Sequence, residues 1–211
     1  MYLPKQFEET RTEVLHSFMQ ERSFAALVVA TDEGLSVDHI PFLVDETSGP
    51  FGTLRGHLAR ANPILTATRV DMDAVAIFQG PHHYITPSWY ATKAETGKVV
   101  PTWNYVVVHA YGRPRFIDDE EWVRGHVQHL TLRHEGVRDS PWKVSDAPDE
   151  YIAKQVRGIV GVEMPIARLV GKWKLGQNRS EADQRGMIDG LLLEKEGAAL
   201  ATLIKPTGGQ K

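Results

Sequence analysis

The stretch that most restricts the fold is a Pro-Thr-Trp-Asn-Tyr cluster that runs directly into the β-branched segment Val106 to Val108. An apolar segment of this kind is typical of a strand buried on both faces. Trp103 and Asn104 at the mouth of such a strand suit a planar, partly polar ligand, because the indole offers a stacking face and the amide offers a donor and an acceptor. An ordinary core strand with aromatic packing gives the same pattern, so both interpretations stand at this point.

Short apolar runs separated by turn residues indicate a chain built mainly from hairpins. The runs Phe24 to Ala30 and Leu35 to Val44 flank the turn Asp32-Glu33-Gly34 and predict a β-hairpin. Further strands are expected at 51–58, 74–78, 84–86, 102–117 and 159–175. No strict alternation of strands and helices is found, which disfavours a Rossmann domain. The pattern predicts a mainly β chain with peripheral helices (α+β), in the form of a mostly antiparallel barrel.

Helices are expected at the ends of the chain and as a late insertion. An apolar stripe after Pro4 predicts an N-terminal helix over about 4–22. Asp118 can cap the first of the inserted helices at about 118–157, and Ser180 can cap a C-terminal helix at about 180–195. Residues 59–68 are expected to form a short helix, although Asn62-Pro63 also suits a turn. We expect one domain over residues 1–211.

Composition excludes several classes of protein. The 211 residues carry a net charge of −3 with both signs interspersed, so no electrostatic footprint for nucleic acid is present. The absence of cysteine excludes disulfides, thiolate nucleophiles and cysteine metal sites, and it suits a reducing cytosol. No signal peptide or membrane-spanning stretch is recognisable. A cytoplasmic, soluble protein is therefore expected.

The chain lacks the familiar catalytic motifs. No nucleophile elbow, phosphate-binding loop or dinucleotide-binding glycine motif occurs. His126, His129 and His134 fall near one another on one expected helix, but their spacing lacks a carboxylate partner and predicts no metal site. Catalysis, if present, would depend on a cofactor. Catalytic residues are not identified, and His57 and Tyr105 are the only weak candidates.

Two basic clusters could hold such a cofactor. In the first, Arg55 and His57 share one strand face and precede Arg60 at a strand-to-helix junction, a combination that suits a phosphate. In the second, Lys172 and Lys174 share a strand face, and polar amides follow. Each cluster on its own also fits a solvated surface.

Several motifs in register resemble one known family, the FMN-binding negative transcriptional regulators (PaiB-like proteins) of the FMN-binding split-barrel superfamily. The motifs extend almost from end to end of the chain. They are Met1-Tyr2-x-Pro4, Asp38-His39-Ile40-Pro41-Phe42, Gly56-His57-Leu58-Ala59-Arg60-Ala61-Asn62-Pro63, Ile77-Phe78-Gln79-Gly80-Pro81, Tyr84-Ile85-Thr86-Pro87-Ser88-Trp89-Tyr90, Val100-Pro101-Thr102-Trp103-Asn104-Tyr105, Trp142 with Asp146-Ala147-Pro148, and Gly171-Lys172-Trp173-Lys174-Leu175 with Gln177-Asn178. The resemblance implies a six-stranded antiparallel split β-barrel and a homodimer with FMN at the subunit interface.

The same resemblance assigns the cofactor contacts. The residues expected at FMN are Arg55, Gly56, His57, Leu58, Arg60, Asn62, Thr102, Trp103, Asn104, Lys172, Lys174 and Gln177. Two departures from the family pattern stand out. Gly176 occupies a position where a serine is expected, which removes a hydroxyl from the site, and Ile64-Leu65 replace a more polar pair.

The sequence therefore favours a flavin-dependent redox or sensing protein, of which an FMN-dependent oxidoreductase is one form. In such a site the protein positions and tunes the ring, and the cofactor carries the chemistry. The alternatives are a transcriptional repressor without a recognisable DNA-binding motif, for which the charge gives no support, and a haem-binding split barrel. The electron donor, the substrate and any regulated gene are not readable from the sequence.

Overall fold

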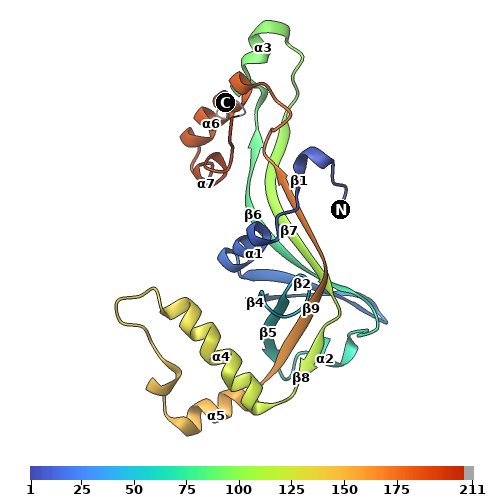
Figure 1. Cartoon of the computed structure of the whole chain (residues 1–211), viewed down its shortest axis with the longest axis vertical. Helices are drawn as coiled ribbons and strands as arrows, with labels where there is room; N and C mark the ends of the chain where they lie inside the picture. Colours follow the sequence, from blue (N-terminus) through green and yellow to red (C-terminus); the bar gives the residue numbers. More distant parts are fainter. Residues whose placement is uncertain (207–211) are drawn as a thin grey trace. The chain divides into compact units, whose positions relative to one another are not determined.

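A computed structural model describes residues 1–206. Nine strands are found in this part of the chain, joined in the order β3-β2-β6-β7-β9-β5-β4, with β1 and β8 each pairing with β9. The strands are β1 (Glu8–Glu9), β2 (Phe24–Thr31), β3 (Gly34–Pro41), β4 (Leu43–Asp45), β5 (Thr53–Ala59), β6 (Ala74–Ile85), β7 (Thr102–Gly112), β8 (Arg115–Ile117) and β9 (Ile159–Lys174). The expected α+β class with a large antiparallel sheet is confirmed (Figure 1). Three of the nine strands, β1, β4 and β8, are only two or three residues long.

Helices are interspersed among these strands. The α-helices are α1 (Thr12–Glu21), α2 (Ile64–Ala67), α3 (Ala91–Thr96), α4 (Glu120–Glu135), α5 (Asp149–Arg157), α6 (Glu181–Leu193) and α7 (Ala198–Ala201). Short 3₁₀ turns cover Lys5–Phe7, Pro87–Trp89 and Val144–Asp146. The expected inserted and C-terminal helices are therefore present, close to their expected bounds.

The chain divides into two compact units. The terminal unit contains Met1–Arg11, Gln79–Val108 and the residues from Val170 onward, and the central unit contains Thr12–Phe78 and His109–Leu169. Strands β6, β7 and β9 contribute residues to both. The single domain over 1–211 stays a prediction.

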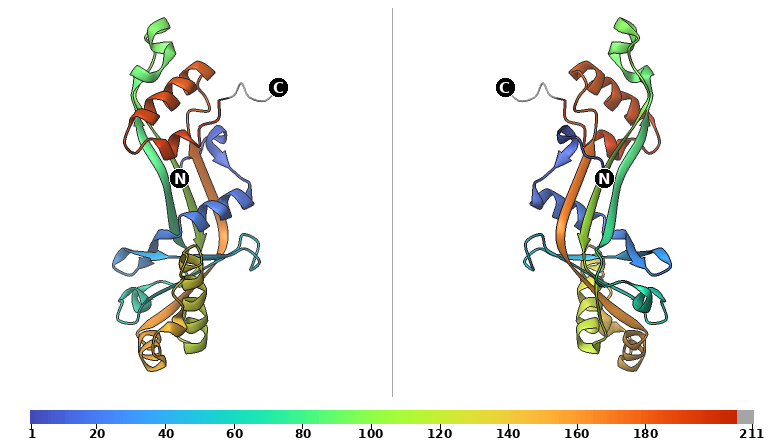
Figure 2. Two further views of the ribbon diagram at one scale, coloured as in Figure 1. Left: turned by 90° about the vertical axis from the view of Figure 1, so that its left-hand side faces the viewer. Right: turned by 90° about the vertical axis from the view of Figure 1, so that its right-hand side faces the viewer.

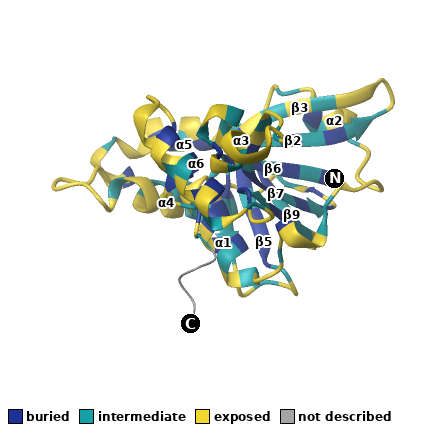
Figure 3. Ribbon diagram, turned by 90° about the horizontal axis from the view of Figure 1, so that it is seen from above, coloured by how far each residue is buried: buried dark blue, intermediate teal, exposed yellow. Residues whose placement is uncertain are grey.

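Strand β5 organises the central unit because its residues alternate between two faces. It pairs antiparallel with β9 from Thr53↔Pro165 to Ala59↔Ile159. Leu54, Gly56 and Leu58 are buried, whereas the residues between them are only half-buried (Figure 3). The inward face therefore belongs to the core, and the other face is free to hold polar side chains.

Helices α4 and α5 lie beside one another in the central unit (Figure 2). The N-cap of α4 is Asp119, not the expected Asp118. The carboxylate of Asp119 accepts a hydrogen bond from the backbone N–H of Trp122 at 2.7 Å, whereas Asp118 pairs with Arg60. Val123 of α4 packs with Ile152 and Val156 of α5 in a buried apolar cluster. Burial of this cluster fixes the position of α4 within its unit.

Helix α6 packs against α3 and the preceding 3₁₀ turn in the terminal unit. Asp183 is buried and accepts hydrogen bonds from both the backbone N–H and the hydroxyl of Thr92, at 2.9 and 2.8 Å. Gly186 and Gly190 weaken the helical propensity of α6, but a Cβ at either position would collide with Trp89. These two glycines therefore allow a close approach that larger residues would prevent.

The structure corrects three expected elements. The N-terminal helix begins at Thr12 instead of about residue 4, because Glu8 and Glu9 pair with the edge of β9 opposite Lys172 and Gly171. The two strands expected at 74–78 and 84–86 form one strand, β6, which continues through Pro81.

The helix expected at 59–68 is reduced to Ile64–Ala67. The side-chain oxygen of Asn62 accepts a hydrogen bond from the backbone N–H of Ile64 at 3.0 Å, which starts the helix after Pro63. The strand expected at 102–117 ends at Gly112 and resumes as β8, as its glycine and proline suggest.

Candidate functional site

A small polar pocket lies within the terminal unit. Its volume is about 180 Å³. The residues that matter for its chemistry are Tyr90, Thr102, Asn104, Lys174, Asn178 and Arg179. Thr102 and Asn104 of β7 both line it, as the alternation along a strand requires, and Lys174 comes from the end of β9.

Two lysines bring positive charge to this pocket and its surroundings. The ammonium of Lys174 donates to the hydroxyl of Thr102 at 2.6 Å and to the carbonyl of Trp103 at 2.8 Å. The ammonium of Lys172 is buried, donates to the carbonyl of Tyr2 at 2.9 Å and lies 5.2 Å from the ring centre of Tyr105. All these partners are neutral. Among residues 1–206 neither lysine forms an ion pair with a carboxylate.

The excess of positive charge perturbs Lys174. Its pKa is lowered, first by burial and then by repulsion from Lys172 and Arg179. Arg179 itself lies over the ring of Tyr90, 4.7 Å from the ring centre. A bound anion would relieve this repulsion, so the pocket has the electrostatics of an anion-binding site.

Asn104 adds a polar group that lacks a strong partner. Its side chain is 1% exposed, and its N–H group reaches only the thioether sulfur of Met187, at 3.8 Å. Sulfur is a weak acceptor, so this buried amide retains hydrogen-bonding capacity for a ligand. Trp103 does not line the pocket: its indole N–H donates to His82 at 3.3 Å, and its side chain is 49% exposed.

Gln177 holds the loop after β9. Its carbonyl oxygen accepts from the backbone N–H of Leu175 at 2.8 Å, and its amide donates to the carbonyl of Trp173. The adjacent Gly176 has a positive φ of 82°, and a Cβ there would collide with the terminal methyl of the buried Met187. The departure from the expected serine therefore has a physical reason, because the loop conformation requires glycine.

The other predicted contacts lie in the central unit. Arg55 forms ion pairs with Asp45 at 2.9 Å and with Glu163 at 3.4 Å. Glu163 also forms an ion pair with Arg115, at 2.9 Å. The charge of Arg55 is thus compensated within its unit. Gly56 and Leu58 are core residues, and a Cβ on Gly56 would press against Ile40 and Phe42.

His57 is paired with a histidine of α4. Its Nδ1 lies 3.2 Å from Nε2 of His126, so one of these two nitrogens donates to the other. Burial lowers the pKa of both residues, that of His126 to about 4 with a further contribution from His57. Nδ1 of His126 is buried and lacks a partner within the described residues. Both imidazoles are therefore neutral at pH 7.

Arg60 and Asn62 make contacts of their own. Both terminal nitrogens of Arg60 donate to Asp118, at 2.8 and 2.6 Å, and its Nε donates to the carbonyl of Arg157 at 2.7 Å. Asn62 donates to Asp38 at 2.9 Å. Arg55 and His57 share one face of β5 as expected, whereas Arg60 turns to a separate set of partners. Their role at a phosphate stays a prediction.

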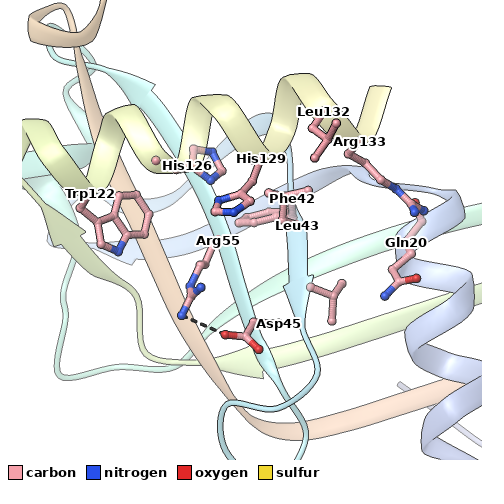
Figure 4. A pocket seen from close by; sticks show the side chains of 12 residues that line it. Gln20, Phe42, Leu43, Asp45, Arg55, Trp122, His126, His129, Leu132 and Arg133 are labelled. Atoms are coloured by element: carbon pink, nitrogen blue, oxygen red, sulfur yellow. Dashed lines mark hydrogen bonds and ion pairs between the residues drawn. The ribbon is translucent and has the colours of Figure 1, made fainter. Parts of the chain in front are cut away.

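A larger cleft lies beneath α4 in the central unit, and the sequence did not reveal it (Figure 4). Its volume is about 750 Å³. It is lined by side chains from α1, β4, β5 and α4, among them Trp122, His126, His129 and Arg133. The spacing of these four residues along α4 was the available signal, since positions three or four residues apart share one helix face.

The described residues contain no group of three or more histidine, aspartate or glutamate side chains that could hold a metal ion. None of the helices in residues 1–206 is both long and apolar enough to cross a membrane.

Comparison with known proteins identifies relatives over the whole chain. Residues 1–168 match the family described as "Putative FMN-binding domain". The chain is 34% identical over 258 residues to an uncharacterized protein of Aspergillus fumigatus, with 100% of this chain and 99% of that protein covered. It is 33% identical over 199 residues to the protease synthase and sporulation protein PAI 2 of Bacillus subtilis, with coverages of 92% and 91%. Lys172, Lys174 and Gln177 lie beyond the segment that the family model matches.

Solved structures share the fold. The FAD and heme binding protein from Mycobacterium smegmatis has a TM-score of 0.58 at 15% identity, covering 80% of this chain and 74% of that one. The flavocytochrome Anf3 from Azotobacter vinelandii has a TM-score of 0.56 at 12% identity, with coverages of 81% and 70%. The predicted family is confirmed: this chain belongs to the FMN-binding family of PaiB-like proteins, with the fold of the flavin-binding split barrels.

Proposed function

We propose that this protein binds FMN and uses it as a redox or sensing group. The observation that carries the proposal is the pocket of the terminal unit, where Lys174 borders a cavity without an ion-paired carboxylate and the buried amide of Asn104 lacks a strong partner. FMN carries a dianionic phosphate and a ring whose pyrimidine edge offers hydrogen-bond donors and acceptors. When bound, it supplies electron or hydride transfer.

The residues of the pocket fit that ring edge better than they fit a purely apolar ligand. The ammonium of Lys174 is held by Thr102 and Trp103, so it is oriented before any ligand arrives. A cation beside the pyrimidine edge favours negative charge on the ring and therefore favours the reduced form. In this proposal Lys174 tunes the cofactor, Asn104 orients it, and Lys172 adds positive charge.

A role of the segment Arg55 to Asn62 at a phosphate rests on the family resemblance alone. Within that segment the charge of Arg60 is compensated by its ion pair with Asp118. The resemblance also supports a homodimer. Light scattering coupled to size-exclusion chromatography tests that state, and a monomeric mass in the presence of FMN would contradict it.

The first experiment is an absorption spectrum of the purified protein, before and after FMN is supplied and excess cofactor is removed. A flavin spectrum that survives desalting supports the proposal. A Soret band would instead favour haem, and the absence of any chromophore after loading would reject the flavin function.

Titration of flavin fluorescence then tests the carrying observation. Lys174→Gln should weaken FMN binding about tenfold, the size expected for one charge-assisted hydrogen bond. Lys98→Gln is the matched control, since Lys98 is an exposed lysine of the same unit and does not line the pocket. Equal affinities of the two variants for FMN would show that this pocket does not bind the cofactor.

A direct role in DNA binding has no supporting observation, since the net charge is −3. A gel-shift assay at low and physiological salt tests it, and specific retention of DNA would change the assignment.

A further inference from the structure

The cleft beneath α4 has walls that suit a flat apolar ligand. Trp122 and the imidazole of His126 are stacked, with ring centres 5.4 Å apart and planes 17° apart. Phe42 and Leu43 contribute further apolar surface from β4 and the residue before it. A volume of about 750 Å³ lies within the range of small-molecule sites. The cleft can therefore accept a planar ring system of moderate size.

The two arginines that line the cleft differ in whether a carboxylate compensates their charge. Arg55 is paired with Asp45, which also lines the cleft, and with Glu163. Arg133 donates only to the backbone carbonyl of Gln20, at 3.3 Å, and forms no ion pair with a carboxylate of residues 1–206. Arg133 thus provides the uncompensated positive charge of the cleft.

Two further groups lie near the charged residues of the cleft. Glu46 accepts a hydrogen bond from the side chain of Gln20 at 2.6 Å but does not line the cleft. His129 precedes Arg133 by one helical turn and also lines the cleft, but its imidazole points toward Arg55 and Phe42, whereas Arg133 reaches toward Gln20 (Figure 4). One end of the cleft therefore holds Arg133, whose guanidinium suits an acidic group on a ligand.

Gly125 shows that this space is open. It lies in the interior of α4, where glycine disfavours a helix, and it lines the cleft. A Cβ built on Gly125 meets no atom within 4 Å. No close packing inside the chain accounts for the glycine, whereas a ligand lying against the helix backbone would.

We propose that this cleft is a second ligand site, which binds a small planar aromatic acid. Trp122, His126 and Phe42 would contact its ring, and Arg133 would bind its carboxylate. The proposal rests on the central unit alone, and Arg55 is the residue of the cleft that is also expected at FMN.

Calorimetric titration with 2-naphthoate tests the site, with Gly125 as the probe position. Gly125→Leu should place a side chain in the open space and weaken binding at least about tenfold, because the ring loses its place in the cleft. Gly125→Ala adds only a methyl group and should keep most of the affinity. Both variants should unfold at a higher temperature than the original chain, since both have better helical propensity than glycine. Equal affinity of all three proteins would overturn the proposal.

The charge is tested separately. 2-Naphthamide has nearly the shape of naphthoate but no charge, and it should bind about tenfold more weakly, as expected for loss of a charged hydrogen bond. Arg133→Gln should remove this difference. Arg124→Gln on the same helix should keep it, because Arg124 does not line the cleft. No measurable naphthoate binding at about 1 mM would reject the site.

Two controls separate this site from the flavin proposal. Gly125→Leu should bind FMN normally, and Lys174→Gln should bind naphthoate normally. Loss of FMN binding in Gly125→Leu would make the cleft part of the flavin site and overturn the second-site proposal. A change of oligomeric state in Gly125→Leu, measured by light scattering, would assign the cleft to a second copy of the chain and overturn it as well.

Discussion

The two basic clusters of the chain are similar in sequence but different in structure. In the central unit Arg55 and Arg60 are neutralised by carboxylates, and His57 is kept neutral by burial. In the terminal unit Lys172 and Lys174 have only neutral partners among residues 1–206. The comparison teaches that a run of basic residues indicates a ligand only where the fold leaves its charge uncompensated. Four experiments test this contrast.

The largest expected effect is acid destabilisation of the central unit through His126. Its folded pKa of about 4 lies below the ordinary value of 6.5, so the unfolded chain binds the proton more readily. The stability from neutral His126 is complete above pH 6.5 and is lost as the pH falls toward 4. The loss should be on the order of 3 kcal/mol.

Urea unfolding at pH 7 and at pH 4.5 measures this loss. His126→Gln should show a much weaker dependence on pH between those values. His134→Gln on the same helix is the control, since His134 is exposed. An unchanged pH dependence in His126→Gln would show that other groups control acid unfolding.

A second experiment concerns the loop that completes the terminal pocket. Gly176→Ser should destabilise the chain by about 2 kcal/mol, because a side chain is strained at positive φ and also presses on the buried Met187. Gly97→Ser should cost less, since Gly97 has a φ of 66° but open space around its Cβ position. Thermal unfolding of both variants measures the difference, and equal losses would leave only backbone strain as the cause.

A third experiment removes the compensating charge of the central cluster. Glu163 is largely buried and forms ion pairs with both Arg55 and Arg115. Glu163→Gln should therefore lower the free energy of unfolding by about 1–2 kcal/mol. Asp71→Asn breaks an exposed ion pair with Arg69 and should have no measurable effect. Denaturant unfolding compares the two variants. Equal effects would mean that Arg55 needs no compensation.

The smallest effect is expected at Lys174 in the protein without cofactor. Burial and the neighbouring cations lower its pKa below 10.5, so its charged form is destabilising in the folded state. The penalty develops as the pH falls from 10.5 through the folded pKa and is constant below it. Lys174→Gln should therefore slightly raise the melting temperature while it weakens FMN binding. A lower melting temperature in calorimetry would show that its bonds to Thr102 and Trp103 outweigh the repulsion.

The local sequence predicted those helices and strands whose formation depends mainly on their own residues. The helix at Glu120–Glu135 follows a capping aspartate, and β7 follows from the run Val106 to Val108. The early strand at Glu8–Glu9 was missed, because its pairing with β9 is a contact between residues far apart in the sequence. Strand β6 continues through Pro81 for a similar reason, since neighbouring strands override the local preference for a break.

The candidate site was predictable in part. Thr102, Asn104 and Lys174 do meet at one pocket, as the alternation of strand residues suggests. The indole of Trp103 points elsewhere, and Gly56 and Leu58 serve the core. The cleft beneath α4 was signalled only by the spacing of residues on one face of that helix, because its depth depends on how the helix packs on β5. Charge compensation is likewise a tertiary property, because ion pairs between residues far apart in the chain cannot be predicted from the local sequence.

The contact between Gly176 and Met187 also constrains how relatives of this chain can diverge. A serine at 176 is strained by the positive φ of that position, and it also requires the residue at 187 to be smaller or turned away, since Met187 is fully buried. The two positions should therefore change together among relatives. Substitution of Met187 by a smaller residue should come before the substitution of Gly176 by serine. A lineage that acquires serine first passes through a less stable intermediate, so the order of these two substitutions is expected to be fixed.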